Sequence, residues 1–346
     1  MEMEQRKSYL SHRQNHDGFT EPENENKITT IYIGGGTPSQ LSLANLEKIL
    51  VQADNILRCS SEEITLEVNP EDVTAEFAAG LKNIGANRIS MGAQTFDDSR
   101  LKFLNRRHTS HQVYHAVETI CNAGIDNISI DLMFGFPGQS IDDWTNDIKI
   151  AQNLEVKHIS AYGLMYEEGT RLYNMREKNI INEIDEEDSI RMYDKLVEML
   201  TSTGYEHYEI SNFAKNGFRS RHNSCYWHDI PYMGIGAAAH SYNKISRQWN
   251  ISDINKYIEN IEHGHVPMTI ELIDDDTHFN DIITTALRTS DGINIDLLEK
   301  QYKEHILERS EKFISDGVVE IRGNIFKLTH KGIHISDMIM SDLMIV

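Results

Sequence analysis

The chain has 346 residues, enough for one large domain and a smaller one, and it carries a formal net charge of -21. This acidity argues against nucleic acid and anionic membrane surfaces as partners, because both are bound through clustered lysine and arginine. The sequence contains no apolar run of about 18 residues and no charged-then-apolar leader, so it predicts a cytoplasmic protein without a membrane span.

The chain begins with a polar tract at 1–28, which predicts a helix at 1–12 followed by turns. From 29 to 164, short β-rich segments alternate with helical ones, which is typical of βα units around a parallel sheet or barrel. The expected strands are 29–33, 63–68, 88–92, 127–133 and 158–164. The expected helices are 40–55, 74–84, 110–123 and 140–154, with Ser110 and Ser140 as N-caps. In such α/β folds the chemistry lies at the carboxyl ends of the strands.

The second half of the chain predicts a helix at 186–203, a strand at 205–210 and a loop rich in histidine and aromatic residues at 221–242. Beyond it we expect helices at 277–288, 294–300, 303–316 and 329–342, with a hairpin at 318–328. Helices combined with a small hairpin indicate a winged-helix-like module. The predicted domains are therefore an N-terminal tract at 1–28, a barrel at 29–266 and a C-terminal module at 267–346.

Three glycines, Gly34–Gly36, follow the first expected strand directly. Without side chains they leave the backbone open to a ligand, although glycines at this position also serve simply to make a tight turn. The two familiar nucleotide fingerprints fit poorly, since Thr37-Pro38 interrupts the dinucleotide pattern and no P-loop lysine follows. The triplet alone therefore leaves both interpretations open.

Polar side chains near the ends of the next strands favour a binding pocket. Glu67, Gln94 and Asp131 each end or interrupt an apolar segment, and a carboxylate buried there needs a partner or a ligand. Arg106 follows, and its guanidinium can clamp a carboxylate through two hydrogen bonds. Open backbone, acceptors for an amine and hydroxyls, and a carboxylate clamp together suit an amino-acid-bearing nucleoside such as S-adenosylmethionine.

The order and spacing of these motifs resemble the radical S-adenosylmethionine proteins of the coproporphyrinogen dehydrogenase group, and most closely its HemW-type haem-chaperone branch. The resemblance runs from about residue 29 to the end of the chain. It implies an incomplete (β/α)6 barrel whose S-adenosylmethionine site is lined by residues matching the family motifs, with Met165 completing it. The motifs that carry the resemblance are Gly34–Ser39, Glu67–Pro70, Met91–Phe96, Leu104–Thr109 and Asp131–Gln139. The implied site residues are Gly35, Gly36, Thr37, Glu67, Gln94, Arg106, Asp131 and Met165.

A second motif lies in the expected loop and reads His222-Asn223-x-x-Tyr226-Trp227. In the chaperone branch this pattern is associated with haem binding, so the resemblance implies a haem site here with His222 as candidate iron ligand. Imidazole is a common axial ligand of haem iron, and aromatic faces pack on a porphyrin. The alternative is a loop held by its aromatic residues, with a merely hydrogen-bonded histidine. Another histidine group, His108, His111 and His115, is expected to be a solvated helix start.

The family opens with a Cys-x-x-x-Cys-x-x-Cys segment that holds a [4Fe–4S] cluster, and this chain lacks it. The chain's three cysteines, Cys59, Cys121 and Cys225, are spaced too widely to replace it and are expected to be buried apolar residues. About one βα unit is then missing, through a truncated gene model or as a genuine clusterless variant, and truncation is favoured. As written, the chain is predicted not to form a radical.

Three functions follow from the resemblance. The first is a haem chaperone that binds haem and passes it to haem-accepting proteins, on a scaffold that binds S-adenosylmethionine and, in a complete chain, a [4Fe–4S] cluster. The second is an oxygen-independent coproporphyrinogen III dehydrogenase, and the third is a clusterless binding protein. The His222–Trp227 motif favours the chaperone, and the sequence leaves the haem recipient and the oligomeric state open.

Overall fold

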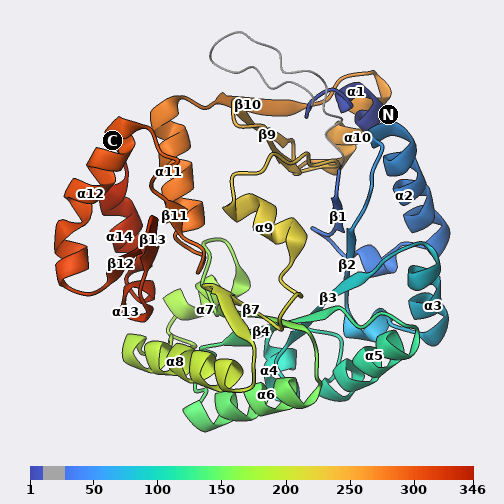
Figure 1. Ribbon diagram of the computed structural model, residues 1–346. Coiled ribbons are helices and arrows are strands. Elements are labelled where there is room, and N and C mark those ends of the chain that lie inside the picture. The colour runs from blue at the N-terminus through green and yellow to red at the C-terminus, as the bar shows by residue number, and fades with distance from the viewer. Residues whose placement is uncertain (11–27) are drawn as a thin grey trace. The chain divides into compact units, whose positions relative to one another are not determined.

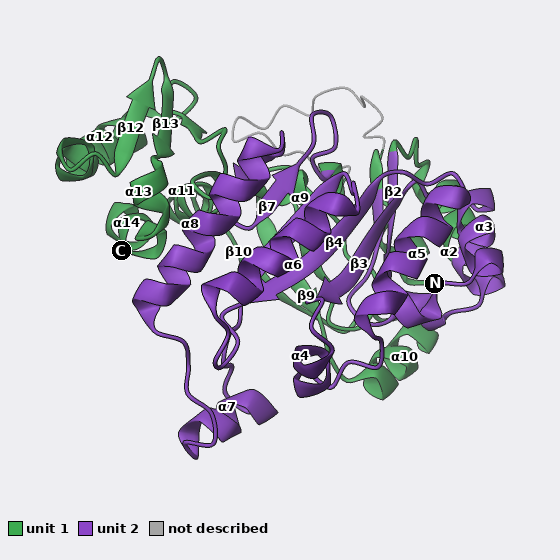
Figure 2. Cartoon of the chain, turned by 90° about the horizontal axis from the view of Figure 1, so that it is seen from below, with its two compact units in different colours: residues 1–30, 49–62, 221–346 green, residues 31–48, 63–220 purple. Residues whose placement is uncertain are grey.

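The computed structural model describes residues 1–10 and 28–346, which divide into two compact units (Figure 2). The first unit combines residues 1–30, 49–62 and 221–346, and the second combines 31–48 and 63–220. In each unit, segments distant in sequence fold together. The helix expected at 1–12 is shorter than predicted, since it spans Glu2–Arg6 and residues 7–10 form turns, while most of the expected turn-rich tract falls outside the described residues.

The larger sheet follows the order β1-β2-β3-β4-β5-β7-β6 (Figure 1). Strands β2 to β5 are parallel neighbours, and the short β7 pairs antiparallel to β5. The predicted α/β class with a mostly parallel sheet is confirmed, because helices alternate with the parallel strands as the sequence pattern required. The strands are β1 (Thr30–Ile33), β2 (Glu63–Val68), β3 (Arg88–Gln94), β4 (Ile128–Phe134), β5 (His158–Gly163), β6 (Glu206–Glu209) and β7 (Asn212–Ala214).

The helices between these strands start where the chain supplies a capping residue. Ser140 caps its helix as predicted, and its hydroxyl accepts a hydrogen bond from the Asp143 N–H. The cap expected at Ser110 is in fact Thr109, which forms a capping box with Gln112, so Ser110 is the first helical residue. The helices are α2 (Leu43–Leu57), α3 (Ala75–Asn83), α4 (Asp98–Phe103), α5 (Ser110–Asn122), α6 (Ile141–Asn153), α7 (Arg171–Glu177) and α8 (Glu186–Ser202).

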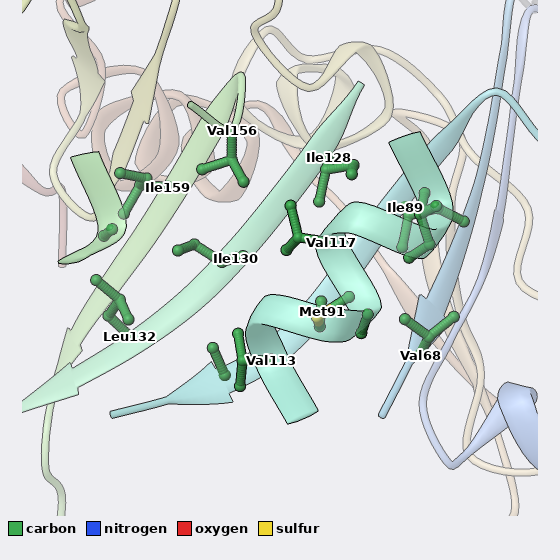
Figure 3. Packing of buried hydrophobic residues seen from close by; sticks show 14 of the residues in the cluster. Val68, Ile89, Met91, Val113, Val117, Ile128, Ile130, Leu132, Val156 and Ile159 are labelled. Atoms are coloured by element: carbon green, nitrogen blue, oxygen red, sulfur yellow. The ribbon is translucent and has the colours of Figure 1, made fainter. Parts of the chain in front are cut away.

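The main hydrophobic core lies between this sheet and its helices, and Figure 3 shows part of it. Alternate residues of each strand face the helices, for example Ile89 and Met91 of β3, which are completely buried. Helix α5 contributes Val113 and Val117, which are spaced one turn apart and therefore lie on one face. The alternation leaves the other residues of each strand on the opposite face of the sheet.

A smaller antiparallel sheet of order β10-β9-β8 belongs to the first unit, and it was not predicted from the sequence. Its strands are β8 (His240–Tyr242), β9 (Ser246–Asn250) and β10 (Met268–Leu272). The buried positions of β9 are Ser246, Gln248 and Asn250, so the strand has no apolar alternation to detect. The same unit contains α1 (Glu2–Arg6), α9 (Arg221–Trp227) and α10 (Ile254–Glu262).

The C-terminal region forms its own hydrophobic core around Phe279, Ile306 and Phe326. The expected hairpin at 318–328 is confirmed. The helix expected at 294–300 is wrong, since Asn294 ends β11 (Ile293–Asn294), which pairs with β13 (Ile325–Leu328), and residues 295–299 are not helical. No helix in the described parts of the chain is long and apolar enough to cross a membrane. The elements are α11 (Asp275–Ala286), β11 (Ile293–Asn294), α12 (Lys300–Ser315), β12 (Val319–Arg322), β13 (Ile325–Leu328), α13 (His330–Ile333) and α14 (Ser336–Leu343).

A buried ion pair fixes the N-terminal helix to the small sheet. Arg6 is 5% exposed and Glu2 4%, and they pair at 3.3 Å. Arg6 donates hydrogen bonds to Ser241 Oγ (2.8 Å) and Gln248 Oε1 (3.1 Å), while Glu2 accepts one from Asn250 Nδ2 (2.7 Å). The helix thus supplies the hydrogen bonds that the polar buried face of β8 and β9 requires.

Replacing Arg6 with alanine is expected to destabilise the protein by about 3–5 kcal/mol, because it leaves the Glu2 carboxylate buried without its cation. Urea unfolding followed by circular dichroism measures the change. Lys7→Ala is the matched control, since its ion pair with Glu4 is exposed and should contribute about 0.5 kcal/mol or less. Equal effects of the two substitutions would contradict the role of burial.

Candidate functional site

The face of the larger sheet that points away from the helices is polar. Leu66, Ile89, Ile130 and Ile159 point into the apolar core, so their strand neighbours project from the other face. A parallel sheet usually buries apolar side chains on both faces. In this sheet the face away from the helices, called the inner face below, is polar instead, so it is suited to hold a polar ligand. Its side chains on β2 to β5 include Thr65, Glu67, Arg88, Ser90, Ser129, Asp131, His158 and Ser160.

Glu67 is fixed beside the glycine triplet. Its two carboxylate oxygens accept hydrogen bonds from the Tyr32 hydroxyl (2.8 Å) and from the Gly35 N–H (3.1 Å). A Cβ at Gly34 would lie 2.5 Å from Tyr32 Cε1 and 2.7 Å from the Glu67 carboxyl carbon, so a larger residue would displace these side chains. Tyr32 was not predicted as a site residue, although the alternation of β1 places it on the same side of the strand as Thr30.

Gln94 and Arg106 converge above Gly92. A Cβ at Gly92 would lie 2.8 Å from Gln94 Nε2 and 3.8 Å from Arg106 Nη2, so both side chains cover this glycine. Gln94 has a φ of 66° at a break in the pairing of β3 with β4. Such a conformation is unusual outside glycine and typical of bulges that redirect a side chain. The structure thus brings these two predicted residues together.

Asp131 lies on the inner face of β4, and its register partner on β5 is Ser160. Burial raises the pKa of its carboxyl to about 6, and the nearby Glu67 carboxylate adds to the rise. The Arg88 and Arg106 guanidinium groups act in the opposite direction and favour the charged form. Two carboxylates and two cations therefore share this face, and the protonation of Asp131 is sensitive to each neighbour.

A more deeply buried group on the same face was missed by the sequence analysis. His158 is hydrogen-bonded through Nδ1 to Ser129 Oγ (2.7 Å) and through Nε2 to the Tyr208 hydroxyl (2.8 Å). Burial, with Arg88 nearby, lowers the pKa of His158 well below its ordinary value. Arg88 is 1% exposed, and among the described residues its Nε and Nη1 have no hydrogen-bond partner. The alternation of β3 and β5 could have identified both residues.

The interpretation of His108 as part of a solvated helix start is wrong. His108 is 3% exposed, with Nε2 3.2 Å from the Ala93 carbonyl oxygen and Nδ1 3.5 Å from a Glu71 carboxylate oxygen. Burial lowers its pKa, while the Ala93 carbonyl opposes this change. It precedes α5, and the turn leading into the helix carries it inward. His111 and His115, which lie within the helix, are exposed as expected.

The His222 motif forms helix α9 rather than the expected loop. The helix places His222 and Tyr226 one turn apart on the same face, and His222 Nε2 lies 2.9 Å from the Tyr226 hydroxyl. Their rings meet edge to face at 5.4 Å. Asn223 and Trp227 occupy the adjoining face of the helix, also one turn apart. The motif spacing is thus explained by helical geometry.

The remaining predicted residues are more exposed. Thr37 lies beyond the glycine triplet at the surface, and Met165, two residues after β5, is 68% exposed. The expectation that all the cysteines are buried is wrong, because Cys121 is exposed and Cys59 and Cys225 are partly buried. Each of these thiols lies on or beside a helix that covers it incompletely. Burial raises the pKa of Cys59 to about 11, so this thiol stays protonated at neutral pH.

Known proteins resemble this chain in sequence and in fold. A family model described as the Radical SAM superfamily matches residues 11–151. The protein named Heme chaperone HemW from Lactococcus lactis is 35% identical over 278 residues, covering 80% of this chain and 73% of that protein. The Heme chaperone HemW of Bacillus subtilis is 33% identical over 312 residues, covering 88% and 82%.

A solved structure described as coproporphyrinogen III oxidase (HemN) from Escherichia coli, a radical SAM enzyme, has a TM-score of 0.77 to this chain. The alignment covers 92% of this chain and 78% of that chain, at 18% sequence identity. At that identity the likeness establishes a shared fold.

Asp131→Asn is expected to stabilise the protein by about 1–3 kcal/mol at about pH 8, with little effect near pH 4. The folded-state pKa of about 6 lies above the ordinary value of 3.8, so folding loses stability as the pH rises through this interval. The asparagine variant does not titrate and escapes the loss. Urea unfolding of both proteins across this pH range measures the difference. A constant difference at every pH would contradict the raised pKa.

Proposed function

The chain belongs to the radical SAM superfamily and, within it, to the family of HemW heme chaperones, and we propose that it binds haem and transfers it to acceptor proteins. The proposal is supported by relatives named heme chaperone, which align with this chain over most of their length. The observation on which it depends is the helix formed by the His222 motif.

Helix α9 offers an imidazole and aromatic side chains from adjacent positions. His222 is partly exposed, and Tyr226 is 39% exposed, so a planar ligand can reach both side chains from solvent. A histidine nitrogen is a standard axial ligand for haem iron, and an aromatic ring one turn away can contact the porphyrin face. We therefore assign His222 as the iron ligand and Asn223, Tyr226 and Trp227 as its surroundings.

The residues of the inner face fit S-adenosylmethionine, which we propose as a second ligand. At Gly35 and Gly36 an added Cβ would meet nothing within 4 Å, so the backbone there is open to a ligand. Glu67, Asp131 and Gln94 supply acceptors for an amine and ribose hydroxyls, and Arg106 supplies a cation for the methionyl carboxylate. Thr37 and Met165 extend the site by family resemblance. When bound, S-adenosylmethionine supplies an activated sulfonium centre.

The cysteines of the given sequence do not fit a [4Fe–4S] cluster. Cys59, Cys121 and Cys225 lack the spacing that lets neighbouring thiolates bind one cluster. Burial raises the pKa of both Cys59 and Cys121, which disfavours the thiolate form that a cluster requires. We therefore derive no radical step for this chain, and the proposed haem function depends on none.

Haem titration of the purified chain tests the assignment of His222. We expect a shifted Soret band on adding ferric haem, and at least a tenfold loss of affinity in His222→Ala, because the iron loses its axial nitrogen. His228→Ala is the matched control. His228 is six residues further on and exposed, and its ring contacts Ser224 and Asp291 instead.

The control should bind haem as the unmodified chain does. An unmodified chain that leaves the haem spectrum unchanged would overturn the proposed function. Equal losses in both variants would instead reject His222 as the specific ligand.

Gly36→Ala tests the S-adenosylmethionine site. The added methyl group meets open space, so the urea midpoint should not change, while the affinity should fall about tenfold or more because the methyl occupies the approach to the backbone. Isothermal titration with S-adenosylmethionine measures the affinity. Unchanged binding would show that the triplet serves only as a turn.

A further inference from the structure

Both ring nitrogens of His222 are engaged before any ligand binds. Nδ1 lies 2.9 Å from Thr30 Oγ1 at the start of β1, and Nε2 lies 2.9 Å from the Tyr226 hydroxyl on α9. Thr30 is separated from His222 by 192 positions in the sequence, yet both belong to the same compact unit. The ring is therefore oriented by a contact from outside its own helix.

The acidities of the two hydroxyl groups decide the direction of these hydrogen bonds. A phenol is a stronger hydrogen-bond donor than an aliphatic alcohol, and an unprotonated imidazole nitrogen is a stronger acceptor than either oxygen. With Tyr226 as the donor to Nε2, the imidazole proton lies on Nδ1 and is donated to Thr30 Oγ1.

This tautomer is the one that a haem ligand needs. Histidines that bind metals almost always donate their other ring N–H to an acceptor, which fixes the ring and strengthens the ligand nitrogen. In this chain the acceptor is the Thr30 hydroxyl, and the nitrogen with the lone pair is Nε2. The Tyr226 hydroxyl lies 2.9 Å from this nitrogen and would have to leave it before iron could bind there.

We propose that Thr30 is a positioning residue that holds His222 in the Nδ1–H tautomer, and that the Tyr226 hydroxyl occupies the iron position until haem displaces it. This inference rests on the proposed haem function and deepens it. His222 Nε2 would hold the iron of a bound haem, and the Tyr226 hydroxyl would then give up its hydrogen bond to that nitrogen.

The surroundings of Tyr226 allow this displacement. Its ring meets Tyr232 edge to face at 4.6 Å, and Tyr232 lies 6.0 Å from Tyr242. The Tyr242 hydroxyl donates a hydrogen bond to Asp229, which also accepts one from Lys244. Tyr226 thus packs against a group of aromatic rings, and the residue as a whole is 39% exposed.

The experiment compares Thr30→Val, Thr30→Ser and Tyr226→Phe in the full chain. Ferric haem titration gives the affinity, and resonance Raman spectroscopy of the dithionite-reduced complex gives the iron–histidine stretching frequency. Thr30→Val keeps the shape but removes the acceptor, so we expect about a three- to tenfold weaker affinity and a lower stretching frequency. Thr30→Ser should restore both, and Tyr226→Phe should bind haem about three- to tenfold more tightly.

The outcomes separate this inference from the proposed function. If the unmodified chain binds haem and His222→Ala abolishes binding, an unchanged stretching frequency in Thr30→Val overturns the positioning role. A Tyr226→Phe variant with equal or weaker affinity overturns the role of the hydroxyl as occupant of the iron position. If the Thr30→Val protein fails to fold, Thr30→Ala, which also lacks the acceptor, takes its place with the same measurements and the same outcomes. Absence of haem binding in the unmodified chain rejects the function itself.

Discussion

The strand alternation that divides the larger sheet into an apolar and a polar face determines most of what this chain can do. In β3, Ile89 and Met91 face the helices, while the alternating residues Arg88 and Ser90 lie on the inner face. A slip of one residue in any strand would exchange the two faces and bury charges among the helices. The apolar face therefore fixes the register, and the register places the polar residues of the candidate site.

The inner face carries charges of both signs, and each sign reduces the cost of burying the other. Glu67 is held by Tyr32 and the Gly35 N–H, and the raised pKa of Asp131 shows how costly a second carboxylate is at this depth. The Arg88 and Arg106 guanidinium groups reduce this cost from the same face. A ligand carrying both an amine and a carboxylate would complete the arrangement, because it offers each sign of charge an additional partner.

The strands of the parallel sheet could be predicted nearly to the residue, since apolar and β-branched residues mark them and glycine or proline ends them. Glu63–Val68 agrees with its expected bounds. The small sheet could not be predicted, because Gln248 and Asn250 are buried polar residues whose partners, Arg6 and Glu2, are remote in sequence. Helix α9 was missed for a related reason. Its seven residues include no buried one, so the periodicity that indicates a helix is absent.

Strand β1 explains why the segment before the glycine triplet carries a threonine and a tyrosine two residues apart. Side chains at such positions point to the same side of a strand. Thr30 contacts His222, and Tyr32 holds the Glu67 carboxylate. The same four-residue strand therefore supplies a hydrogen-bonding partner to the proposed iron ligand and to the proposed S-adenosylmethionine site. Haem ligation at His222 needs an imidazole, its acceptor and a displaceable hydroxyl, and none of these depends on an iron–sulfur cluster. The proposed haem function is thus physically independent of radical chemistry.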